Sequence, residues 1–246
     1  MVTGAACHGT VAVVGAGDFI GAAIARKFAA EGYTVFLGRR SGDRLEPLKA
    51  EIEAAGGRAV ARSLDARDEA QVIAFLADAE AEAPLAACIF NIGANVQFPL
   101  VETSARVFRK VWEMACFAGF LTGREAAKHM LPRGRGSIFF TGATAGLRGG
   151  AGYAAFASAK FGLRAVAQAA ARELGPLGLH VAHLVIDAGV DTAWVRERIG
   201  EAAIATMQPG QLMRPEAVAE AYWALHQQPI DAWTFEQEIR PFAERW

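Results

Sequence analysis

Residues 10–30 read TVAVVGAGDFIGAAIARKFAA, an apolar run followed by a glycine-rich turn and a second apolar segment. The first run is rich in Val and predicts a buried strand, and Ile20–Ala30 has the composition of a helix. Gly15, Gly17 and Gly21 between them would let the backbone approach a pyrophosphate at the helix start. Strand, turn and helix in this order are the context that a dinucleotide-binding motif requires. Glycines also serve tight turns for backbone reasons alone, so both interpretations stay open here.

The rest of the chain repeats this alternation of short apolar runs and longer helical segments. Further strands are predicted at residues 34–37, 58–64, 86–90, 137–141, 180–186 and 234–239. Helices are predicted at residues 43–55, 68–79, 104–130 and 153–174. This alternation is typical of right-handed crossovers and of a parallel sheet covered on both faces. We therefore predict one α/β domain over residues 1–246, a Rossmann-type doubly wound sheet of about seven strands.

Composition and charge exclude several classes of protein. Of the 246 residues, 53% are hydrophobic, enough for a large core, so a disordered chain is excluded. The 25 basic and 26 acidic residues show no long run of either sign, which argues against a nucleic-acid partner. Three widely spaced cysteines predict neither a disulfide nor a metal site. The chain shows no signal-peptide or membrane-span pattern, so we expect a soluble, cytoplasmic protein without a membrane partner.

The end of the second predicted strand indicates which dinucleotide is favoured. An acidic residue about 20 positions after the first strand usually binds the ribose hydroxyls of NAD. This chain has Arg39 and Arg40 instead, and a guanidinium can bind the 2′-phosphate of NADP bidentately. Asp18 inside the glycine loop points the other way, because a carboxylate near a phosphate is unfavourable. Two solvated surface arginines are the alternative, and NADP(H) is favoured over NAD(H).

The motifs, in this order and spacing, resemble those of the short-chain dehydrogenase/reductase family over about residues 10–190. The glycine loop resembles the TGxxxGxG turn of that family, although Val14 replaces the usual Thr and Phe19 the middle Gly. The resemblance implies a bound nicotinamide dinucleotide, and a substrate loop and C-terminal region in residues 187–246. The cofactor-binding positions that it implies are Gly15, Gly17, Phe19, Ile20, Gly21, Arg39, Arg40, Asp65, Asn91, Gly93, Lys160 and Thr192.

Three of the four catalytic positions that the resemblance implies have no polar side chain. The family uses a Tyr that moves the proton, a Lys that tunes it and holds the nicotinamide ribose, a Ser and an Asn. Lys160 is retained, whereas Phe156, Ala143 and Ala115 occupy the Tyr, Ser and Asn positions. Loss of a general acid alone costs about 10²–10⁴ in rate. Ordinary carbonyl reduction should therefore be severely impaired.

Other side chains could supply the missing acid. Tyr153 lies seven residues before Lys160, two turns away on the same helix face, or it only packs at the helix start. Asp187 is either a new acid at the mouth of the sheet or a turn residue. Thr144 should point away from the site if the backbone is strand-like. We expect His183 to be a core histidine with both ring nitrogens satisfied.

Three functions remain open, and the sequence does not decide whether the chain is an enzyme. The first is an NADP-dependent oxidoreductase of a small carbonyl compound or alcohol with a displaced acid. The second is a non-catalytic dinucleotide-binding sensor or partner subunit, and the third a structural protein that binds nothing. The resemblance also implies that the helices at 104–130 and 153–174 pair across a two-fold axis, giving a homodimer or homotetramer. No metal is expected, and the substrate is unknown.

Overall fold

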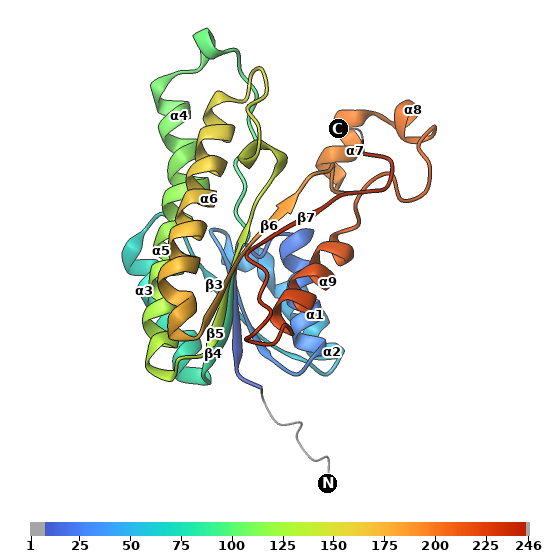
Figure 1. The fold of residues 1–246 in the computed structure, drawn as a ribbon. Coiled ribbons are helices and arrows are strands. Elements are labelled where there is room, and N and C mark those ends of the chain that lie inside the picture. The colour runs from blue at the N-terminus through green and yellow to red at the C-terminus, as the bar shows by residue number, and fades with distance from the viewer. Residues whose placement is uncertain (1–7, 245–246) are drawn as a thin grey trace.

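The strands of the computed structural model, which describes residues 8–244, lie in the order β3-β2-β1-β4-β5-β6-β7 and pair in parallel (Figure 1). They are β1 (Thr10–Val14), β2 (Thr34–Arg39), β3 (Arg58–Ser63), β4 (Leu85–Phe90), β5 (Gly136–Thr141), β6 (Leu179–Ile186) and β7 (Glu236–Ile239). The order reverses between β1 and β4, which is the switch point at which such sheets bind ligands. The predicted doubly wound fold is confirmed.

Helices cover both faces of the sheet (Figure 1). One layer contains α1 (Ile20–Ala30), α2 (Glu46–Ala54) and α9 (Pro215–His226). The other contains α3 (Glu69–Glu82), α4 (Ala105–Trp112), α5 (Ala118–Met130) and α6 (Ala154–Leu174). The short helices α7 (Ala193–Ile199) and α8 (Glu201–Ile204) project beyond the carboxyl ends of the strands. Single 3-10 turns span Gly42–Leu45, Leu100–Glu102, Leu131–Arg133, Thr144–Gly146 and Gly175–Leu177.

The core is divided by the sheet into two apolar layers, and β1 contributes to both. Val11 and Val13 pack with α1 and α9, whereas Ala12 and Val14 pack with α3, α5 and α6. All five residues of β1 are buried. A parallel strand covered on both faces needs apolar side chains at every position, which explains the continuous apolar run in the sequence.

The predicted helix at 104–130 is interrupted in the structure. It consists of α4, a π-helical turn at Glu113–Phe117, and α5. Ser104 begins it as the N-cap, and its Oγ accepts a hydrogen bond of 3.3 Å from the Val107 N–H. Hydrophobic periodicity cannot reveal such a turn, because the apolar pattern continues through it. Ala115 lies inside the π-helical turn, and such turns are frequent at functional sites.

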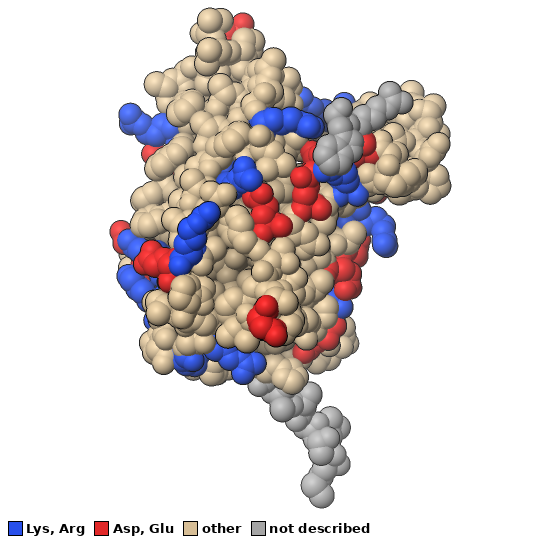
Figure 2. Space-filling model, viewed as in Figure 1, with Lys and Arg blue, Asp and Glu red and all other residues tan. Residues whose placement is uncertain are grey.

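Acidic and basic side chains are mixed on the face of the molecule that Figure 2 shows. On the face drawn in Figure 2, Lys and Arg side chains alternate with Asp and Glu, and no continuous patch of one sign is visible. Within residues 8–244, none of the helices is both long enough and apolar enough to cross a lipid bilayer.

Candidate functional site

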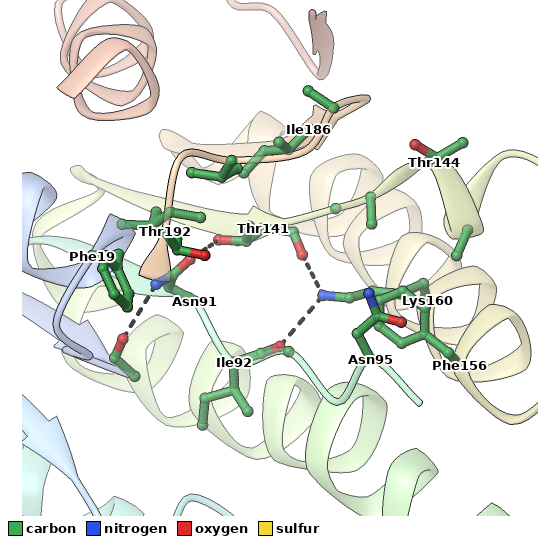
Figure 3. A pocket seen from close by; sticks show the side chains of 18 of the residues that line it. Phe19, Asn91, Ile92, Asn95, Thr141, Thr144, Phe156, Lys160, Ile186 and Thr192 are labelled. Carbon is green, nitrogen blue, oxygen red and sulfur yellow. Dashed lines mark hydrogen bonds between the residues drawn. The ribbon is translucent and has the colours of Figure 1, made fainter. Parts of the chain in front are cut away.

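A cavity of about 620 Å³ opens at the carboxyl ends of β1, β4, β5 and β6 (Figure 3). Its volume is in the range of small-molecule sites. A neighbouring cavity of about 380 Å³ extends towards the ends of β2 and β3. Gly15, Gly17, Asn91 and Gly93 line both cavities. The two therefore form one elongated groove across the switch point of the sheet.

The glycine loop is shaped to accept a group from outside the chain. Gly15 has a φ of +95°, and a Cβ there would lie 2.7 Å from the carbonyl oxygen of Asn91. A Cβ on Gly21 would collide with the carbonyl oxygen of Gly15, so loop and helix are in direct contact. A Cβ on Gly17 or Gly93 would meet no atom within 4 Å. The first two glycines thus serve packing, whereas the last two leave open space that suits a pyrophosphate. Phe19 and Ile20 line the same space.

Three arginines line the smaller cavity. Arg39 donates through Nη1 to Asp18 Oδ1 at 2.7 Å. In the sequence, Arg39 favoured NADP(H) and Asp18 argued against it, and in the structure the two form an ion pair. Arg67 pairs with Asp65, with Nε 2.9 Å from Oδ1, and holds the pKa of that carboxyl below its usual value. Arg40 is exposed and makes no ion pair within the described chain. Sequence reasoning missed Arg67, whose only signal was its place two residues after Asp65.

A hydrogen-bond chain ties the groove to the sheet and to α9. Asn91 Nδ2 donates to the carbonyl oxygen of Gly15 at 3.2 Å, and Thr141 Oγ1 donates to Asn91 Oδ1 at 3.1 Å. Since the Thr141 proton is used there, the Tyr222 hydroxyl 2.7 Å away must donate to Thr141 Oγ1. Burial raises the pKa of Tyr222. Neither Thr141 nor Tyr222 was indicated by a sequence pattern.

Lys160 is buried beneath the groove, with 2% of its surface exposed. Its Nζ donates to the carbonyl oxygens of Thr141 at 2.8 Å and Ile92 at 3.3 Å (Figure 3). Burial lowers the pKa of Lys160 to about 8. The ring of Phe156 lies beside it, with its centroid 6.0 Å from Nζ. Lys160 is thus a cation held by backbone carbonyls, without a carboxylate partner within the described residues.

The three positions that lack polar groups lie together in one apolar cluster. Ala115 and Phe156 are buried in this cluster, and Ala143 and Tyr153 pack against it. Phe156, Ala143 and Lys160 all line the larger cavity. The structure therefore brings together the positions that sequence reasoning singled out.

The structure places Thr144 differently from expectation and decides which groups surround Asp187. Thr144 lies in a 3-10 turn rather than a strand, so it lines the cavity instead of pointing away. Its hydroxyl donates to the carboxylate of Asp187 and lies apart from Lys160 in Figure 3. Asp187 is buried and has Arg148 and Arg240 3.8 Å from its two oxygens. The cavity is lined by Ile186 and Ala188 rather than by Asp187. Tyr153 lines the cavity and packs against the apolar cluster.

His183 and Thr192 complete the survey of predicted positions. His183 is buried and bonds through Nδ1 to Glu236 at 3.0 Å, but its Nε2 has no partner within the described chain. The expectation of a fully satisfied core histidine was therefore wrong. Burial lowers the pKa of His183 to about 4. Thr192 lines the cavity and caps α7, with Oγ1 accepting from the Val195 N–H at 3.1 Å.

The two described cysteines, Cys88 and Cys116, are buried free thiols, and Cys7 lies outside the described residues. Burial raises the pKa of both thiols. Across residues 8–244, no group of three or more His, Cys, Asp and Glu side chains is placed to hold a metal ion.

Comparison with known proteins gives consistent matches. Residues 9–201 match the short chain dehydrogenase family. The cis-4-hydroxycyclohexanecarboxylate dehydrogenase of Sinomonas cyclohexanicum is 34% identical over 214 residues, 85% of each chain. The crystal structure of a short-chain dehydrogenase from Rhodopseudomonas palustris is 64% identical, with a TM-score of 0.83 over 95% of this chain and 99% of that one. A metagenomic short-chain oxidoreductase, crystallised with NADP, is 25% identical, with a TM-score of 0.82 over 96% of this chain and 98% of that one.

Replacing Lys160 by Met should change how stability depends on pH. The folded protein releases the Lys160 proton near pH 8, whereas the unfolded chain holds it up to the usual pKa of 10.5. Between these values the unfolded chain binds more protons, so the free energy of unfolding of the natural protein rises with pH. Over this pH range, the free energy of unfolding of the natural protein should rise by about 1–3 kcal/mol more than that of Lys160→Met. Urea unfolding from pH 7.5 to 10 measures it.

The matched control is Lys110→Met, because Lys110 is exposed and makes no ion pair within the described residues. This variant should keep the slope of the natural protein. A natural protein and a Lys160→Met variant with parallel pH profiles would show that the Lys160 pKa is not lowered.

Proposed function

Because this chain belongs to the short-chain dehydrogenase/reductase family, we propose that it is an NADP(H)-dependent oxidoreductase of a small carbonyl compound or alcohol, with Tyr153 in place of the missing phenol. The observation that carries this proposal is the larger cavity. This one cavity is lined by the glycine loop, Lys160 and Tyr153. A dinucleotide along the groove and a substrate beside Tyr153 would then share that space.

The choice of NADP(H) rests on the smaller cavity. Arg39, Arg40 and Arg67 line it, and two of the three are already neutralised by Asp18 and Asp65. Arg40 is left as the cation for a 2′-phosphate, whose negatively charged oxygens can accept two parallel hydrogen bonds from a planar guanidinium. The NADP bound to the metagenomic relative supports the same choice.

The chemistry divides between the dinucleotide and the protein. When bound, the nicotinamide supplies the hydride to the carbonyl carbon, or accepts it from the alcohol. Lys160 would hold the nicotinamide ribose, and Thr192 would orient the carboxamide. The Tyr153 hydroxyl would give its proton to the carbonyl oxygen, which becomes the alcohol. Tyr153 would then recover a proton from solvent at the open side of the cavity.

The substrate class follows from Arg148. This residue lines the cavity, its side chain is 56% exposed, and its ion pair with Asp187 is long, at 3.8 Å. Asp187 is shared with Arg240, so Arg148 keeps much of its positive charge for a ligand. The Sinomonas relative acts on a hydroxy acid, as its name states. We therefore propose a hydroxy or oxo acid, with its carboxylate at Arg148.

The second candidate function is dinucleotide binding without turnover. It is favoured by the apolar cluster around Phe156, Ala115 and Ala143, since the usual proton relay is absent as a set. In that case Lys160 would serve only to hold the ribose, and the protein would act as a sensor or partner subunit.

The exposed face of α4, α5 and α6 supports self-association. Phe108, Trp112, Phe120 and Phe161 are each 40–42% exposed there. Large aromatic side chains on adjoining helices are typical of a surface that another chain covers. We propose that a second copy of this chain covers them, giving a homodimer or homotetramer.

Arg40→Ala should reduce the preference for NADPH over NADH. A charge-assisted hydrogen bond is worth about 1.5–3 kcal/mol, which corresponds to roughly 10–150-fold in affinity. Calorimetric titration should give that ratio for the natural protein and near-equal affinities for the variant. Arg44→Ala is the control, because Arg44 is exposed and lies outside the groove lining. Equal affinities in the natural protein would contradict the assignment.

Tyr153→Phe should lower kcat for reduction of oxocyclohexanecarboxylate by about 10²–10⁴ and leave the Kd for NADPH unchanged. The loss of NADPH absorbance measures the rate. Cyclohexanone, which lacks the carboxylate, should show a higher KM than the oxo acid in the natural protein, and Arg148→Ala should abolish that difference. Equal kcat in the natural protein and Tyr153→Phe would exclude Tyr153 as the acid.

Tight NADPH binding without turnover would favour the second function instead. The triple variant Phe156→Tyr, Ala143→Ser and Ala115→Asn then becomes decisive. It should gain carbonyl reduction if the missing relay was the only obstacle, and stay inactive if the cavity excludes substrates.

The double variant Trp112→Asp and Phe120→Asp should separate the subunits. Two buried like charges on each side of a two-fold contact are strongly unfavourable. Light scattering should give a multiple of 26.1 kDa for the natural protein and a single chain for the variant. A natural protein that is already a single chain would refute the proposed assembly.

A further inference from the structure

A cavity of about 870 Å³ lies at the opposite end of the sheet from the candidate active site. It opens where β4, β5 and β6 begin and where α9 ends, near the lower edge of the sheet in Figure 1. Its walls include Tyr33, Arg135, Ser137, His226 and Trp233. The proposed oxidoreductase chemistry uses none of these residues.

His226 joins two hydroxyl groups in the wall of this cavity. Its Nε2 lies 3.0 Å from the Tyr33 hydroxyl, and its Nδ1 lies 3.0 Å from the Ser137 hydroxyl. Burial, with nearby His180 and Arg135, lowers the pKa of His226 to about 4, so the ring is neutral. A neutral imidazole donates through one nitrogen and accepts through the other. One hydroxyl therefore accepts from His226 and keeps its own proton for another acceptor.

Arg135 supplies a positive charge beside these hydroxyls. It is exposed, and within the described residues it has no ion-pair partner. Arg133, two residues earlier, provides the contrast: it pairs with both carboxylate oxygens of Glu80 and donates to the Leu85 carbonyl at 3.2 Å. The cavity thus combines one uncompensated guanidinium with one free O–H donor, and both favour an anionic acceptor.

Trp233 and Ile230 make part of the remaining wall apolar. The Trp233 ring stacks on His180, with centroids 5.1 Å apart and planes 1° from parallel. Ile230 is 70% exposed at the same cavity. The volume is too large for a bare inorganic ion and falls in the range of small-molecule sites. Small-molecule sites usually combine apolar side chains with convergent polar groups, and both are present here.

We propose that this cavity binds a small organic anion. Its acid group is held by Arg135 and by the free hydroxyl of the Tyr33–His226–Ser137 chain. Its apolar body lies against Trp233 and Ile230. The acid group is a carboxylate or a phosphate ester, which share the same acceptor chemistry.

Titration of the natural protein with benzoate, phenyl phosphate, inorganic phosphate and benzyl alcohol tests this proposal. Benzoate or phenyl phosphate should bind at least about tenfold more tightly than benzyl alcohol, which lacks the charge. Either should also bind more tightly than inorganic phosphate, which lacks the apolar body. The tighter of the two identifies the acid group as carboxylate or phosphate ester.

Arg135→Ala should weaken binding of the preferred anion by about 10–150-fold. Arg172→Ala, which removes another exposed arginine, should leave it unchanged. Arg40→Ala should also leave it unchanged, which separates this cavity from the dinucleotide groove. Equal weakening by Arg135→Ala and Arg172→Ala, or no preference for the anions over benzyl alcohol, would overturn the proposal. A thermal unfolding midpoint of Arg135→Ala equal to that of the natural protein verifies that the variant is folded.

Discussion

The buried ammonium of Lys160 is the constraint around which the candidate-site end of this protein is organised. A buried cation is costly unless its protons are hydrogen-bonded. Lys160 bonds to the carbonyl oxygens of Thr141 and Ile92, and so joins α6 to the ends of β5 and β4. An ammonium has three N–H donors, and these bonds use two. The third donor has no partner within the described residues, and Lys160 lines the larger cavity, so the interaction that joins three elements also places an N–H donor at the groove.

The resemblance in sequence places Ala115, Ala143 and Phe156 where the family has three polar groups of one relay. In a buried relay each group is the partner of the next, and an orphaned polar group costs about 1–3 kcal/mol. Once one member is lost, apolar residues at the remaining positions become favourable. Ala115, Ala143 and Phe156 fit that description, because they share one apolar cluster. Lys160 differs from these residues because its hydrogen-bond partners are backbone carbonyls. A side-chain substitution elsewhere does not remove a backbone carbonyl, so Lys160 keeps its partners.

Much of the fold could be predicted from the sequence, because it depends on local patterns. The apolar run of β1, the glycine turn and the limits of α1 follow from composition over a few residues. The site was predictable only where a motif carried it, as for Lys160 and Asn91. The pairing of Arg39 with Asp18, the place of Arg67 and the turn at Thr144 depend on side-chain choices that periodicity does not encode. The contact between Tyr33 and His226 joins residues 193 positions apart, so only the folded chain reveals it.

Helix α9 reaches from one end of the sheet to the other. Tyr222 bonds to Thr141 beneath the groove, and His226, four residues later, bonds to Tyr33 and Ser137 at the far cavity. Residues four apart share one face of a helix, so both bonds hold the same side of α9 against the sheet. If a ligand at either end moves α9, reciprocity requires that the two ligands change each other's affinity by the same factor. A displacement of α9 along its axis would therefore strain hydrogen bonds next to both cavities.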